Sequence, residues 1–231
     1  MSIAPIAAGL AAVAGTLAWG VYDPNSPLFG PVIGRGADDA VYLSFDDGPS
    51  EETTPVVLDV LAREGAPAAF FMVGRHARAL PALTRAAGTA GHLLGNHTDT
   101  HVKLHRRSPA RIRRELTDAH HTLAELAGRP PAAFRAPHGY RNPFVRSAAE
   151  RLGYAVFGWS FGVWDTARPG AETIRSRVRT KLRPGAIVLL HDGDGYDPHG
   201  DRSQTAAALP GIIRDIRDAG YRLASLAELV P

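Results

Sequence analysis

The sequence predicts an α/β protein built around one parallel β-sheet. From residue 40 onward, short apolar runs alternate with stretches of helical period, and turns rich in glycine and proline separate them. The chain of 231 residues suits one α/β domain better than two and is long enough to bury a core. Its 24 glycines and 18 prolines follow no period, and 45% of its residues are hydrophobic, which excludes collagen-like and disordered chains.

The amino end predicts an apolar helix over residues 1–22. This segment carries no charged side chain, and large apolar residues recur every three or four positions, at Ile3, Ile6, Leu10, Val13 and Leu17. A helix of about 20 apolar residues can span a bilayer, and Trp19 and Tyr22 stand where interfacial aromatic residues are found. A membrane anchor, a signal cleaved at the A-x-A site of residues 12–14, and a helix packed on the domain all stay open. We expect membrane association through residues 1–22 and a membrane-anchored or extracytoplasmic protein, with a cytoplasmic location still open.

The rest of the chain divides into a linker and one domain. Residues 23–39 contain three prolines and three glycines and predict an extended linker, so the domain is expected at residues 40–231. Its strands are predicted at Ala40–Phe45, Ala68–Val73, His92–Gly95, Tyr154–Trp159, Ala186–Leu190 and Tyr221–Ala224. Helices are predicted at Thr54–Arg63, Arg78–Ala87, Pro143–Leu152, Glu172–Leu182 and Thr205–Ala219, and another is opened by Pro109 and ended by Gly128.

Two features of composition restrict the function. The chain has no cysteine, so it has no thiol catalysis and no disulfide, and any metal ion must be held by His, Asp or Glu. The formal net charge is only +3, and nucleic-acid-binding proteins usually carry a larger and more concentrated excess, so we expect no nucleic-acid partner. The basic run from Lys103 to Arg114 is interpreted as a solvated helix face, with contact to a membrane surface as the alternative.

Polar side chains gather where the predicted strands end, which is where parallel α/β proteins place their chemistry. Asp46 and Asp47 follow the first strand, and two adjacent carboxylates ionise together only when a cation lies beside them. A metal ion and an arginine would serve, giving one metal ligand and one general base; a solvated Asp-Gly turn is the alternative.

A second strand end supplies imidazoles. His97 and His101 are four residues apart, so on a helical turn they point the same way and can share one cation. Alone this spacing is a weak signal, but with Asp47 it makes two imidazoles and one carboxylate with an open position, the pattern of a catalytic metal site. Further strand ends carry Arg135, before a turn shaped by proline and glycine, and His191.

These motifs resemble those of the polysaccharide deacetylases with a NodB homology domain, also called carbohydrate esterase family 4. The resemblance covers about residues 40–228 and is carried by Ser44–Pro49 (T-F-D-D-G-P), His97–His101 (H-[ST]-x-x-H), Arg135–Gly139 (R-x-P-[YFW]-G) and Leu189–His191 (L-x-H). It implies a distorted (β/α) barrel with fewer than eight repeats.

The resemblance also implies a mechanism and a role for each residue. A divalent metal ion, with zinc as the first expectation, would be held by Asp47, His97 and His101 and would activate a water and an N-acetyl carbonyl. Asp46 would be the general base, aligned by Arg135, and His191 the general acid for the leaving amine. Further roles are implied for Asp165, which would hold His191, for the backbone N–H of His138 as oxyanion donor, and for Trp164 in the substrate groove.

Two departures from the family pattern bear on the substrate. His138 replaces the aromatic residue of the third motif, and the fourth motif (W-S-x-D-x-x-D-W) reads Trp159 to Thr166, with Gly162 in place of one acid. The expected function is removal of N-acetyl groups from amino sugars of a glycan. Alternatives are an amidase or deformylase of the same chemistry on a lipid-linked sugar or small-molecule amide, and a catalytically silent carbohydrate-binding module.

Overall fold

The computed structural model describes the backbone of residues 4–231 and places eight strands in one sheet. The strands are β1 (Ala40–Asp46), β2 (Ala68–Met72), β3 (Leu93–Asn96), β4 (Ala133–Phe134), β5 (Ala155–Val156), β6 (Phe161–Gly162), β7 (Ile187–His191) and β8 (Arg222–Ala224). Seven follow the order β5-β4-β3-β2-β1-β7-β6, every named pair is parallel, and β8 pairs with the start of β1. This sheet, surrounded by helices, confirms the expected distorted (β/α) barrel.

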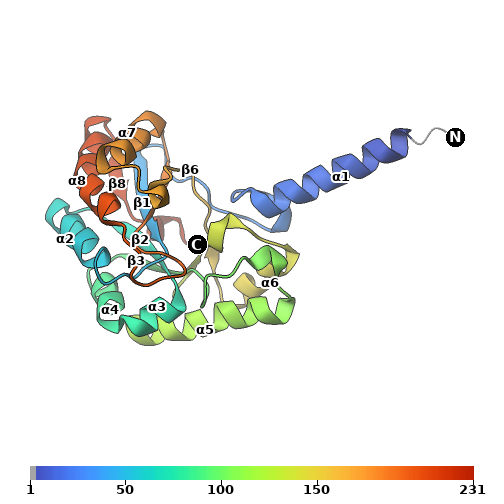
Figure 1. Ribbon diagram of the computed structural model, residues 1–231, viewed down its shortest axis with the longest axis horizontal. Helices are drawn as coiled ribbons and strands as arrows, with labels where there is room; N and C mark the ends of the chain where they lie inside the picture. The colour runs from blue at the N-terminus through green and yellow to red at the C-terminus, as the bar shows by residue number, and fades with distance from the viewer. Residues whose placement is uncertain (1–3) are drawn as a thin grey trace.

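Helices follow most of the strands and cluster around them (Figure 1). The helices are α1 (Ala4–Tyr22), α2 (Thr54–Glu64), α3 (Gly74–Ala79), α4 (Pro81–Thr89), α5 (Pro109–Ala127), α6 (Pro143–Arg151), α7 (Ala171–Lys181) and α8 (Ser203–Asp218). Single 3-10 turns lie between them, including η2 (Leu104–Arg106), η3 (Pro137–Gly139) and η4 (Asp165–Ala167). Proline occupies the first turn of α5, where a missing N–H costs nothing, and Gly128 ends it in the left-handed conformation.

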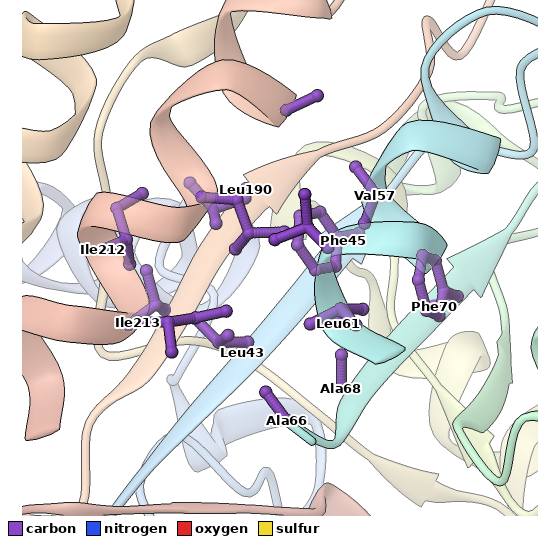
Figure 2. Close-up of a cluster of buried hydrophobic side chains, with 14 of the residues drawn as sticks. Leu43, Phe45, Val57, Leu61, Ala66, Ala68, Phe70, Leu190, Ile212 and Ile213 are labelled. Carbon is purple, nitrogen blue, oxygen red and sulfur yellow. The ribbon is translucent and has the colours of Figure 1, made fainter. Parts of the chain in front are cut away.

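The core lies on both faces of the sheet because side chains alternate along each strand. On one face, Leu43 and Phe45 of β1 lie among the side chains of α2 and α8 (Figure 2). Tyr42, on the opposite face of β1, belongs to a second cluster with Phe71 and Phe157. Burying one such side chain fully contributes about 1.5–3 kcal/mol, so this packing fixes the strand register that positions the site.

The structure differs from the predicted elements at three places. The single helix predicted over Arg78–Ala87 is two helices, because the chain leaves helical geometry at Leu80 and Pro81 starts a new helix. The strand predicted over Tyr154–Trp159 is shorter: it pairs with β4 at Ala155–Val156 and forms a single bridge to Ile33 at Phe157. The strands β4 and β6 were missed, because two residues are too short to show a period.

The helix predicted at the amino end spans Ala4–Tyr22 and projects from the side of the molecule on which α6 lies (Figure 1). Ile3 lies outside the described residues, as does the side chain of Ile6. Across the part of the chain that the structure describes, no helix is both long and apolar enough to cross a membrane. The end of α1 and the segment after it contact the domain: the backbone N–H of Arg141 donates to the carbonyl of Val21 (3.2 Å), and Asn25 Nδ2 donates to that of Trp159 (2.9 Å). The domain boundary at residue 40 stays a prediction.

Candidate active site

The site begins at the carboxyl end of β1, which lies between β2 and β7 in the sheet. Asp46 is the last residue of β1 and is in register with His191, the last residue of β7. Asp47 follows in the left-handed conformation (φ 76°), which turns its side chain away from the strand direction. Both carboxylates are buried, so each needs a charged or hydrogen-bonding partner.

Asp47, His97 and His101 come together as the candidate metal ligands. One ligand atom from each lies within 4.8 Å of the others, and all three residues are buried. Asp47 Oδ1 is 3.3 Å from Nε2 of His97 and 3.0 Å from Nε2 of His101. Positive φ angles at Thr98 (68°) and His101 (56°) bend the chain after β3, so the two imidazoles converge without a regular helix.

The hydrogen bonds of this cluster suit a bound cation. Nδ1 of His97 donates to the carbonyl of Arg135 (2.9 Å), which leaves a lone pair on Nε2 pointing toward Asp47. Asp47 Oδ1 is buried and has no hydrogen-bond partner within the described residues. Converging lone pairs without a donor are unfavourable unless a cation lies between them, and two imidazoles with one carboxylate are a donor set that catalytic Zn²⁺ sites use. The residues therefore fit a divalent metal ion.

Asp46 forms an ion pair with Arg135. The Arg135 guanidinium, fully buried after β4, donates to Asp46 Oδ1 (2.7 Å) and to Ser44 Oγ (2.9 Å), and its other terminal nitrogen donates to the Gly158 carbonyl (2.9 Å). Its charge also lies 4.1 Å from the centre of the Phe71 ring. The second oxygen of Asp46 lies 3.8 Å from His97 and points into the same pocket as the candidate ligands.

His191 forms a separate pair with Asp165. Nδ1 of His191 donates to Asp165 Oδ1 (2.9 Å), while the His191 backbone N–H (2.8 Å) and the Thr205 hydroxyl (3.0 Å) donate to Oδ2. Burial disfavours a charged imidazole, but the Asp165 carboxylate outweighs it and raises the pKa of His191 to about 9. Burial likewise raises the pKa of Asp165, yet the charge and hydrogen bonds of His191 lower it overall. At neutral pH His191 is thus a protonated acid.

The pocket that joins these groups has a volume of about 420 Å³. Two exposed aromatic residues, Trp164 (75% exposed) and Tyr196 (57% exposed), contribute to its lining. Trp164 has left-handed backbone geometry (φ 57°) and immediately precedes Asp165. His138 also lines the pocket and has left-handed backbone geometry (φ 58°).

Sequence reasoning missed several residues of the site. Nδ1 of His76, at the start of α3, donates to the backbone carbonyl of Asp47 (3.0 Å) and steadies that turn. The Thr54 hydroxyl donates to the Asp192 carboxylate (2.6 Å). Burial and the neighbouring Asp47 raise the pKa of Asp192 to about 7, although the hydrogen bond from Thr54 lowers it. Ser44 could have been found, since it lies two residues before Asp46 and therefore on the same face of β1. The other contacts depend on long-range packing that leaves no local pattern.

Comparison with known proteins agrees with this geometry. Residues 34–157 match the polysaccharide deacetylase family. The chain is 39% identical to a chitooligosaccharide deacetylase of Bradyrhizobium sp. (strain ANU 289), over 82% of this chain and 90% of that protein. It is 36% identical to a peptidoglycan-N-acetylglucosamine deacetylase of Bacillus cereus, over 82% of this chain and 87% of that protein.

Solved structures give the same result for the fold. A mutant with restored enzymatic activity, made from a carbohydrate esterase family 4 pseudoenzyme of Bacillus anthracis, superimposes with a TM-score of 0.80. That structure is 27% identical in sequence, and the match covers 89% of this chain and 72% of the other. With a family match over more than half of its length and relatives above 30% identity, the chain belongs to the polysaccharide deacetylase family.

Proposed function

We propose that this protein removes N-acetyl groups from the amino sugars of a glycan by metal-dependent hydrolysis. The observation that carries the proposal is one pocket containing a candidate metal cluster (Asp47, His97, His101), an ion-paired carboxylate (Asp46) and a protonated histidine (His191). The two curated relatives are named for the deacetylation of chitooligosaccharides and of peptidoglycan N-acetylglucosamine, which supports an N-acetylated amino sugar as the substrate class.

Zinc is the ion we propose for the cluster, because two neutral imidazoles and one carboxylate with an open position are typical of catalytic zinc. When bound, such an ion polarises the substrate carbonyl and lowers the pKa of water toward roughly 7. Protonation of the ligands competes with the metal, so affinity should fall as the pH is lowered.

The residues of the chain divide the proton transfers between them. Asp46, hydrogen-bonded to Arg135, accepts the proton of the attacking water. The backbone N–H of His138 donates to the carbonyl oxygen as it becomes negative, and one such donor is worth about 3 kcal/mol. His191, held protonated by Asp165, donates a proton to the nitrogen as the C–N bond breaks, so that acetate and a free amine leave. Trp164 offers an exposed aromatic face to the sugar.

The test is acetate release from N-acetylated chitooligosaccharides, with and without a chelator and after adding back zinc. We expect turnover that the chelator abolishes and zinc restores. His97→Ala should lose both stoichiometric metal and turnover, while His121→Ala, on the exposed side of α5, is the matched control. A His97→Ala protein that keeps one zinc per chain would contradict the ligand assignment.

A panel of substrates decides between the proposed function and its alternatives. Release of acetate or formate from a lipid-linked sugar or a small amide, with no activity on chitooligosaccharides, would favour the amidase or deformylase reading. Binding of glycans without any release would favour a silent carbohydrate-binding module. The presence of Asp46, Asp47, His97 and His191 in one pocket speaks against that module.

We also propose that residues 1–22 associate with an anionic membrane surface and that the enzyme works on its extracytoplasmic side. Every residue from Gly9 to Trp19 is exposed and none is charged. Tyr22, at the end of α1, packs against His105 (5.5 Å between ring centres), beside exposed basic residues at Lys103, Arg106, Arg107, Arg113 and Arg114. Each basic residue near an anionic surface contributes about 1 kcal/mol, which adds to the insertion of apolar side chains.

Co-sedimentation of the full chain with vesicles tests this membrane proposal. Binding should be strong to vesicles with anionic lipid, weaker to neutral vesicles, and lost in Leu10→Asp/Leu17→Asp. Arg113→Glu/Arg114→Glu should weaken it in a salt-dependent way, with the exposed Arg179→Glu of α7 as the control. Equal binding of all variants would refute it. For the side of the membrane, added protease should cleave the protein on intact cells, and full protection there would contradict an extracytoplasmic location.

A further inference from the structure

A hydrogen bond crosses the mouth of the pocket between two segments that are far apart in the sequence. The hydroxyl of Tyr196, in the loop after β7, lies 3.0 Å from Nε2 of His138, in the turn after β4. Both residues line the pocket. His138 is the position at which this chain departs from the aromatic residue of the third family motif, so the bond belongs to this chain and not to the motif.

Tyr196 approaches His138 from a loop that is held in place. The guanidinium of Arg75 donates to the carbonyls of Gly195 (2.9 Å) and Tyr196 (2.7 Å). Asp194 Oδ1 accepts the backbone N–H of Tyr196 (3.0 Å), and its other oxygen accepts from the buried Arg202 (2.9 Å). The backbone that carries the phenol ring of Tyr196 is therefore held in place. The ring lies edge-on to the imidazole of the candidate metal ligand His101, with 4.9 Å between the ring centres.

His138 needs such support. Its backbone is left-handed (φ 58°, ψ 6°), a conformation that costs a non-glycine residue about 1 kcal/mol or more. Its side chain is exposed, and in the part of the chain that the structure describes the bond to Tyr196 is its one side-chain hydrogen bond. Its backbone N–H has no hydrogen-bond partner there, which leaves that group free for a ligand.

We propose that Tyr196 is a positioning residue that fixes the turn at His138 and thereby aims the His138 N–H at the oxygen that gains negative charge. The inference rests on the proposed deacetylase function. The imidazole restrains the strained turn because its ring is hydrogen-bonded to Tyr196 in the loop after β7. Rotation of the peptide plane of His138 would break this hydrogen bond. Oxyanion donors act through alignment fixed before the reaction, so loss of the tie should slow the chemical step and leave substrate binding nearly intact.

The test is a double-mutant cycle of Tyr196→Phe and His138→Phe, followed by kcat and KM for acetate release from a chitooligosaccharide. Tyr196→Phe keeps the ring and removes only the hydroxyl; His138→Phe keeps the backbone N–H and removes the partner nitrogen. We expect Tyr196→Phe to lower kcat about tenfold, the order of one net hydrogen bond, with KM changed less than about twofold. In the His138→Phe background the same change should have no further effect, because the bond is already absent.

The controls separate this inference from others. Tyr221→Phe makes the same chemical change far from the pocket and should match the wild type, and thermal unfolding should show every variant folded. A rise in KM at constant kcat would overturn the inference and make Tyr196 a direct sugar contact. Equal losses in both backgrounds, or no loss at all, would also overturn it. Absence of activity in the wild type itself would instead refute the deacetylase function.

Discussion

Replacement of Asp165 by asparagine is the sharpest test of whether Asp165 keeps His191 protonated. The carboxylate accepts a hydrogen bond from Nδ1 of His191 (2.9 Å) and is the first of the charges that raise the pKa of that imidazole against its burial, ahead of Asp47 and Asp46. Asparagine has nearly the same shape but carries no charge. The pKa of His191 should therefore fall from about 9 toward the ordinary value of about 6.5.

The expected effect depends strongly on pH. At pH 8 an acid of pKa about 9 is about 90% protonated, whereas one of pKa about 6.5 is about 3% protonated, which predicts about a 30-fold loss of rate. At pH 6 both forms are more than about 75% protonated, so the two enzymes should differ less than about twofold from this cause. Because the pKa is raised in the folded protein, the protonated form is lost as the pH rises, and the alkaline limb must move to lower pH.

The assay is the pH profile of kcat/KM for an N-acetylated oligosaccharide and, in parallel, for an aryl acetate. A phenolate leaves without a proton, so the aryl ester should show little of the alkaline loss. Thr205→Val removes only a neutral hydrogen bond to Asp165 and should shift the limb much less. An unchanged alkaline limb in Asp165→Asn, or equal shifts for amide and ester, would refute the role of Asp165 and the general-acid role of His191.

Three further perturbations test other parts of the site. Asp47→Asn should lose bound metal, whereas Asp46→Asn should keep it and lose about 10²–10⁴ in kcat, as metal analysis and kinetics will show; the reverse pattern would exchange the two roles. Arg135→Met leaves a buried carboxylate unpaired and should destabilise the fold by about 3–5 kcal/mol in denaturant titration, and an unchanged midpoint would contradict this. Gly195→Ala places a Cβ 2.2 Å from the His101 ring and should weaken metal affinity about 10–100-fold in chelator competition. Unaltered affinity would contradict this and show that the loop moves away from His101.

The sequence predicted the fold well where periods were long. Strand β1 is one residue longer than predicted, and helix α5 starts at Pro109 and is ended by Gly128 as predicted. A buried strand and an amphipathic helix each show their period over several repeats. The two-residue strands β4 and β6 leave no such pattern, although one of them leads directly to Arg135. Their place in the sheet is decided by neighbouring strands and not by their own residues.

The candidate site shows the same division. Residues at strand ends, such as Asp47, His97 and His191, were expected together because parallel strands meet at one edge of the sheet, and the structure brings them together. Their roles stay predictions. The link from His76 to the Asp47 carbonyl and the bond from Tyr196 to His138 could not be foreseen, because they join a helix and a loop to backbone turns across long stretches of chain.

The left-handed residues at the pocket have a consequence for engineering this protein. Of the six non-glycine residues with positive φ in the described chain, five (Asp47, Thr98, His101, His138 and Trp164) belong to the pocket motifs. At each, glycine or asparagine would relax the backbone, so a selection for thermal tolerance alone would favour replacements in the candidate active site before anywhere else. Libraries screened by melting temperature would therefore enrich inactive proteins. Mutations meant to raise the thermal stability of this protein should be made in α2, α7 and α8, with these five positions kept unchanged.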